Sequence, residues 1–77
     1  MERSARNPVL VAFGATVRRL RKERGHSQEA FGEMCGIDRS YMGGIERGEH
    51  NLALVNIMKI VKALEIQPSE FFRNLDQ

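Results

Sequence analysis

Residues 27–48, SQEAFGEMCGIDRSYMGGIERG, carry the pattern that decides the fold of this 77-residue chain. Ser27 is a good cap for a short helix, and Gly36 can take the left-handed conformation that ends one. Asp38 then offers a second cap, and Gly48 a second stop. The stretch therefore predicts two short helices joined by a tight turn at Gly36.

Two short helices at this spacing are typical of a helix-turn-helix, in which one helix braces the other and the second enters the major groove of DNA. In the first helix, the positions expected to face inward are Ala30, Phe31, Met34 and Cys35. In the second helix, they are Tyr41, Met42 and Ile45. The opposite side of the second helix is then the candidate DNA-reading surface.

Three further amphipathic patterns surround this unit. Residues 8–24 follow an Asn7-Pro8 start and place apolar side chains at three- and four-residue steps, at Leu10, Phe13, Val17 and Leu20. Residues 54–64 repeat the pattern at Leu54, Ile57, Met58, Val61 and Leu64. A last helix opens at Pro68 and runs through Glu70, Phe71, Phe72 and Leu75. With no strand pattern in the sequence, the expected fold is all-α, a compact five-helix bundle whose second and third helices form the helix-turn-helix.

The composition predicts one small domain over residues 1–77, with a short flexible N-terminus at 1–6 and a C-terminal tail at 76–77. Apolar residues make up 42% of the chain and charged residues 29%, with no long apolar run, so we expect no membrane partner. The N-terminal sequence lacks a secretory pattern. Cys35 is the only cysteine, which excludes an internal disulfide and fits a reducing compartment. These features predict a cytoplasmic protein.

Residues suited to catalysis are not grouped in the sequence. One cysteine and two isolated histidines, His26 and His50, form neither a nucleophile–base pair nor a metal-ligand spacing. We therefore expect a protein that is not an enzyme and that takes no metal, no cofactor and no small-molecule ligand.

The net charge of +2 is only mildly basic, so bulk charge does not by itself indicate a nucleic-acid partner. Five cations crowd the end of the first helical pattern: Arg18, Arg19, Arg21, Lys22 and Arg24. Cations are also favourable at the C-terminal end of any helix, through its dipole. These five cations are therefore not specific evidence by themselves, and it is the neighbouring helix-turn-helix pattern that favours DNA phosphates as their partners.

The side of the second short helix opposite Met42 and Ile45 carries no large apolar group. The residues expected to contact bases or the groove are Arg39, Ser40, Tyr41 and Gly43. An arginine in the first turn of such a helix can bond N7 and O6 of guanine together. Tyr41 lies on the flank, where core packing is the commoner role and contact with the backbone or a thymine methyl is the alternative. Residues expected to contact phosphates are Gln28, Arg47, His50 and Asn51.

Gly43 and Gly44 are adjacent inside this helix, where each glycine costs about 1 kcal/mol relative to alanine. Bare backbone there allows close approach to DNA or to the preceding helix, and simple tolerance is the alternative.

One recognition helix reads few base pairs, so we expect a homodimer on half-sites about 34 Å apart. The chain must then supply a self-complementary apolar face. Candidates for this face lie on the last two helices: Val55, Met58, Phe72 and Leu75.

From Phe13 to Phe71, the sequence resembles the Cro and phage-repressor family of helix-turn-helix DNA-binding proteins. The resemblance rests on VRRLRKERGHSQEAFGEMCGID (17–38), YMGGIERG (41–48) and IMKIVKALEIQPSEFF (57–72). It implies that Gln28 grips the DNA backbone, that Arg39 touches base edges together with Ser40, and that a buried ion pair joins Arg21 to Glu46.

Within that family, DRSYMGGIERGEHNL (38–52) is similar to the controller proteins of restriction-modification systems, which are small dimeric regulators. The resemblance implies that Arg39, Ser40 and Tyr41 read or bend DNA. The sequence departs from the pattern of this family at three places. Phe31-Gly32 stands in place of the family's usual Leu-Ala, and Ala53 in place of a Ser or Thr cap. Gly43 occupies a position where related proteins often carry serine.

These features predict a sequence-specific DNA-binding transcriptional regulator that binds a palindromic operator in double-stranded DNA as a homodimer and controls a restriction-modification operon. The alternative is an antitoxin, or another protein-binding helix-turn-helix module, that represses its own operon. RNA binding is less favoured because no aromatic stacking sheet or glycine-rich clamp is visible.

Overall fold

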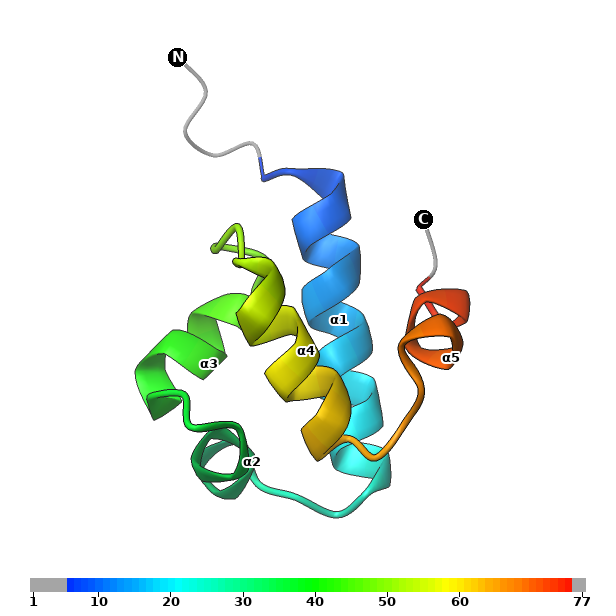
Figure 1. The fold of residues 1–77 in the computed structure, drawn as a ribbon. Coiled ribbons are helices and arrows are strands. Elements are labelled where there is room, and N and C mark those ends of the chain that lie inside the picture. Colours follow the sequence, from blue (N-terminus) through cyan, green and yellow to red (C-terminus); the bar gives the residue numbers. More distant parts are fainter. Residues whose placement is uncertain (1–5, 76–77) are drawn as a thin grey trace.

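The computed structural model describes residues 6–75, and within that range the chain forms five α-helices and no strand (Figure 1). The helices are α1 (Pro8–Glu23), α2 (Gln28–Cys35), α3 (Arg39–Glu46), α4 (Leu54–Ala63) and α5 (Pro68–Arg73). The predicted all-α, five-helix fold is therefore confirmed.

The expected tails, 1–6 and 76–77, lie outside the described residues except for Arg6. The guanidinium of Arg6 donates to the carbonyl of Arg47 and pairs with the carboxylate of Glu49 at 3.3 Å. Arg6 is therefore held against the C-terminal end of α3.

The capping residues act as the sequence predicts. Asn7 accepts a hydrogen bond from the amide of Val9 at 2.8 Å, and the hydroxyl of Ser27 accepts one from the amide of Ala30 at 3.0 Å. Gly36 ends α2 with φ 71°, a left-handed conformation that costs glycine little. These local interactions fix where α1 and α2 begin and where the turn into α3 occurs.

The long helix α1 packs against α3, α2 packs against α3 and α4, and α4 packs against α5 (Figure 1). The side chains that fill the space between them are fully buried and include Val17, Phe31, Met42, Ile60, Leu64 and Phe71. Burial of each large side chain stabilises the fold by about 1.5–3 kcal/mol. This core fixes α2 and α3 relative to each other.

Five side chains that the pattern places inside are exposed instead: Ala30, Met34, Tyr41, Leu54 and Met58. The helix α2 meets its neighbours along Phe31, Gly32 and Cys35, so Ala30 and Met34, each one residue earlier, are turned about 100° toward solvent. Leu54 is the first residue of α4 and is 70% exposed beyond the end of the core. Met58, expected both inside and at a dimer face, is 43% exposed. In these short helices, the face that packs against the core is narrower than the distribution of apolar residues predicts.

The helix α4 starts without a side-chain cap. Ala53 occupies the capping position and makes no capping hydrogen bond. We expect Ala53→Thr to stabilise the fold by about 1 kcal/mol, which raises the melting temperature of a domain this size by about 4–8 °C. Ala53→Val is the matched control because it adds the same branched shape without the oxygen. Equal melting temperatures for the two variants, measured by circular dichroism, would contradict the capping role.

Candidate nucleic-acid interface

The first turn of α3 is held by one carboxylate. Oδ2 of Asp38 accepts hydrogen bonds from the amide of Ser40 at 3.0 Å, the hydroxyl of Ser40 at 2.6 Å and the amide of Tyr41 at 3.4 Å. These hydrogen bonds hold the pKa of Asp38 below its usual value, and the bond from the hydroxyl of Ser40 contributes most. Because the hydroxyl proton of Ser40 is engaged, its oxygen is left to accept a hydrogen bond from a base amino group.

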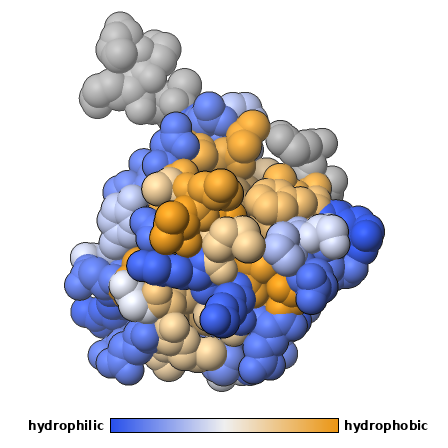
Figure 2. Space-filling model, viewed as in Figure 1, coloured by the Kyte–Doolittle hydropathy of each residue, from blue (hydrophilic) through white to orange (hydrophobic). Residues whose placement is uncertain are grey.

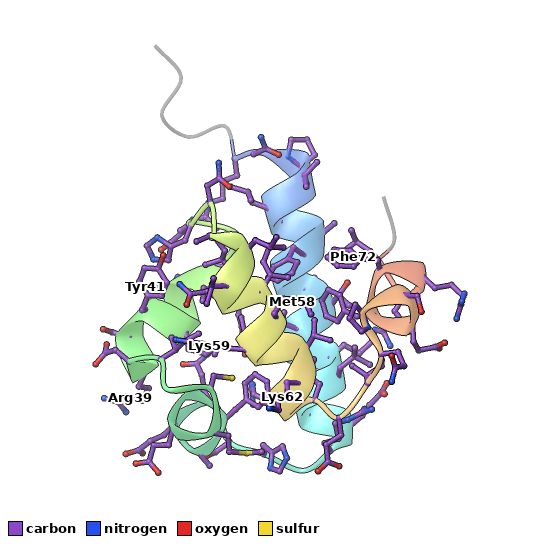
Figure 3. The ribbon with its side chains drawn as sticks, in the orientation of Figure 1. Arg39, Tyr41, Met58, Lys59, Lys62 and Phe72 are labelled. Atoms are coloured by element: carbon purple, nitrogen blue, oxygen red, sulfur yellow. The ribbon has the colours of Figure 1, made fainter. Side chains whose placement is uncertain are left out.

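Arg39 lies in this turn with its guanidinium exposed. It makes no hydrogen bond or ion pair with any other described residue. Figure 3 shows Arg39 and Tyr41 on the outer edge of α3, directed away from the body of the molecule. All five donors of this guanidinium are therefore open to a ligand.

The ring of Tyr41 lies on the surface, 37% exposed, and the expectation that it faces the core is wrong. It is stacked on the imidazole of His50, with ring centroids 4.1 Å apart and planes 13° from parallel. His50, predicted to contact phosphate, therefore has one face covered by Tyr41.

Gly43 and Gly44 are both buried, although the sequence places them on the open side of α3. A side-chain carbon added at Gly43 would lie 3.2 Å from a guanidinium nitrogen of Arg47 and 3.3 Å from the amide oxygen of Gln28. The bare backbone is covered because neighbouring side chains fold over it.

A polar recess, lined by Arg18, Arg21, Gln28, Gly43, Glu46 and Arg47, opens where α1, α2 and α3 meet. Arg18 is one of the five cations noted at the end of the first helical pattern, but the sequence pattern does not predict it individually as a phosphate contact. It lies three positions before Arg21 and so shares its face of α1, which is the signal that identifies it. The recess places Arg18 and Arg47 beside Gln28, where an anion would be favoured.

A buried ion pair forms the base of this recess. Nε and Nη2 of Arg21 donate to the two oxygens of Glu46 at 2.7 and 3.0 Å, with both side chains less than a tenth exposed. Arg21 also donates to the carbonyl of His26 at 2.9 Å, and Nε2 of Gln28 donates to Glu46 at 3.1 Å. The hydrogen bonds to Glu46 raise the pKa of Arg21. The pair implied by the family resemblance is present, and Gln28 keeps one amide hydrogen for a further acceptor.

Arg47 and Asn51 lie at and beyond the C-terminal end of α3, and both are exposed. Arg47 is paired with Glu49, with Nε 2.9 Å from the carboxylate. This hydrogen bond raises the pKa of Arg47 and lowers that of Glu49, so both groups are charged at neutral pH. A phosphate at Arg47 would have to replace Glu49.

Burial raises the pKa of Cys35 to about 11, so its thiol is protonated at neutral pH. Within residues 6–75, no three His, Cys, Asp or Glu side chains are grouped to hold a metal. No helix of the described chain has the length and apolarity to cross a membrane.

A helix-turn-helix family model matches residues 17–71. The chain belongs to this family, whose members are DNA-binding transcriptional regulators rather than enzymes. The control protein C.MunI of Mycoplasma sp is 39% identical over 72 residues, which cover 92% of this chain and 97% of that protein. The control protein C.BamHI of Bacillus amyloliquefaciens is 42% identical over 65 residues, or 83% of this chain and 80% of that protein.

Two solved structures extend the similarity to the fold. The restriction-modification controller protein C.AhdI from Aeromonas hydrophila is 52% identical, with a TM-score of 0.78 over 82% of this chain and 96% of that one. The controller protein C.Esp1396I, as a tetramer in complex with its natural 35 base-pair operator, is 32% identical, with a TM-score of 0.84 over 90% of this chain and 91% of that one.

Removal of Arg21 leaves the buried carboxylate of Glu46 without its partner. We expect Arg21→Met to lower the free energy of unfolding by about 3 kcal/mol, since an unpaired buried charge is strongly destabilising. Urea denaturation measures the loss. Arg18→Met, at an exposed site on the same face, is the control and should leave stability nearly unchanged. A stable Arg21→Met protein with altered sequence preference would overturn the structural assignment of the pair.

Proposed function

We propose that this protein is a sequence-specific regulator that binds a palindromic operator in double-stranded DNA as a homodimer and controls a restriction-modification operon. The observation that carries the proposal is the first turn of α3, where Asp38 fixes an exposed Arg39-Ser40-Tyr41 run beside the polar recess. A rigid turn with open donors is what base reading in the major groove requires. An operon as the target places the protein in the cytoplasm with the DNA.

The roles follow from the chemistry of each side chain. Arg39 donates to a guanine, Ser40 accepts from a base amino group, and Tyr41 packs against the sugar–phosphate backbone or a thymine methyl. Gly43 is covered by Gln28 and Arg47, so its bare backbone leaves room for these two side chains and not for close approach of DNA. Phosphates are held by Gln28, Arg47 and Asn51, with Arg18 added from the structure.

The similar solved structures support the assignment of the first turn. Variants of C.Esp1396I replace an arginine, a threonine and a tyrosine at three successive positions. Arg39, Ser40 and Tyr41 repeat that order of residue types, with serine in place of threonine. The operator complex of the same controller protein supports an operator as the partner.

The homodimer is supported by exposed apolar side chains on α4 and α5. Val55 is 65% exposed and Phe72 45%. Figure 2 shows apolar residues gathered over this side of the molecule, and Figure 3 places Met58 and Phe72 away from Arg39. Phe72 and the half-buried Leu75 also line an apolar groove with Phe13 and Ile57 of α1 and α4. A second copy on this face would leave both α3 helices open to DNA.

Arg39→Ala should relax sequence preference at one guanine by about 1–3 kcal/mol. Selection of bound duplexes from a random pool, followed by titration of single-base changes, measures this loss. Arg39→Lys is the control, because it keeps the charge and removes the two-pronged hydrogen bond. Equal weakening at every base position in Arg39→Ala would make Arg39 a phosphate contact and contradict base reading.

Met58→Asp should dissociate the dimer, because it places a charge in the apolar face of each subunit. Met34→Asp is the matched control, since Met34 is similarly exposed, at 49%, but lies on α2. Sedimentation equilibrium at micromolar concentration measures the oligomeric state, and we expect Met58→Asp to be monomeric and Met34→Asp to remain dimeric. A monomeric wild-type protein, or a Met58→Asp protein that remains dimeric, would contradict this interface.

A further inference from the structure

The loop between α3 and α4 returns to the outer edge of α3. The amide of Glu49 donates to the carbonyl of Gly44 at 2.9 Å, and the amide of Gly48 donates to the carbonyl of Ile45 at 3.0 Å. The carboxylate of Glu49 is held in turn by Arg6 and Arg47. The backbone of the next residue, His50, is therefore held in place by interactions of the loop and not by its own side chain.

The imidazole of His50 lies between two features of α3. One is the ring of Tyr41, nearly parallel to it at a centroid distance of 4.1 Å. The other is the backbone at Gly44, one helical turn after Tyr41, where an added side-chain carbon would lie 2.4 Å from Nε2 of His50. A side chain at position 44 would therefore displace the imidazole, and glycine leaves room for it in its stacked position. A glycine inside a helix is unfavourable relative to alanine, and the stack gives a physical reason for this one.

We propose that His50 is a positioning residue that holds the ring of Tyr41 in one orientation for DNA, and that Gly44 provides the space for it. This role rests on the proposed contact between Tyr41 and DNA. A half-exposed aromatic ring loses rotational freedom when it binds, and a ring already held by a stacked partner loses less. His50 then acts on DNA affinity through Tyr41 and not through a phosphate.

Tyr41 is the only tyrosine of the chain, which has no tryptophan, so its fluorescence reports on this ring alone. A stacked imidazole quenches tyrosine emission. We expect His50→Ala and Gly44→Ala to be brighter than the wild-type protein without DNA. Gly43→Ala is the matched control, because its added carbon meets Arg47 and Gln28 and not His50. Equal emission from the wild-type protein and both test variants would show that the rings do not stack, and would overturn the proposal.

DNA affinity, measured on the duplex selected by the wild-type protein, tests the functional part. His50→Ala should weaken binding by roughly three- to tenfold, the range expected for loss of one aromatic pair. It should have no effect in a Tyr41→Ala background, where there is no ring to hold. His50→Phe should retain most of the affinity, because phenylalanine supplies a flat ring without a hydrogen-bond donor. Gly44→Ala should weaken binding in the wild-type background and not in His50→Ala.

A direct phosphate contact by His50 gives a different result. The effects of His50→Ala and Tyr41→Ala would then add, phenylalanine would not rescue, and the salt dependence of binding would fall by about one phosphate contact. That outcome, or unchanged affinity in His50→Ala, would overturn the positioning role while the proposed function stands. Failure of the wild-type protein to bind any duplex in the selection would overturn the proposed function itself.

Discussion

The buried ion pair between Arg21 and Glu46 is the constraint on which the interface depends. It joins the last turn of α1 to the last residue of α3, and Gln28 at the start of α2 donates to the same carboxylate. Three helices therefore meet at one charged group that water cannot easily replace. Because the pair is buried, loss of either partner would leave a charge unsolvated. The apolar core fixes α2 and α3 relative to each other, and these hydrogen bonds hold Arg21, Gln28 and Glu46 together in the lining of the recess.

The helix α3 contributes to the core and to the proposed recognition surface within eight residues. Met42 and Ile45 are fully enclosed in the core, while Arg39 and Ser40 are exposed in the first turn. Asp38 accepts hydrogen bonds from the backbone amides at the start of the helix, and within residues 6–75 Arg39 makes no hydrogen bond or ion pair. A change in the exposed turn can therefore alter what is bound without unfolding the domain.

The charged groups around the C-terminal end of α3 are paired before any ligand binds. Arg47 and Arg6 share the carboxylate of Glu49, whereas Arg39 has no described partner. Binding of phosphate at Arg47 therefore exchanges one anion for another, while a ligand at Arg39 gains a contact without breaking one. This difference fits the roles proposed above, in which Arg39 reads a base and Arg47 holds a phosphate.

The sequence by itself determined the five helices and where α1, α2 and α3 begin, because capping by Asn7, Ser27 and Asp38 and the turn at Gly36 depend on residues only a few positions apart. The last helix was expected to run through Leu75, whereas α5 ends at Arg73. The sequence also indicated the exposed arginine at the start of α3, through the simple alternation of apolar and polar faces. Tertiary structure alone decided which apolar residues stay outside, as Met34 and Leu54 do, because that depends on where neighbouring helices lie. It also decided the stack of Tyr41 on His50, since eight residues of chain separate two rings that meet only after the loop folds back on α3.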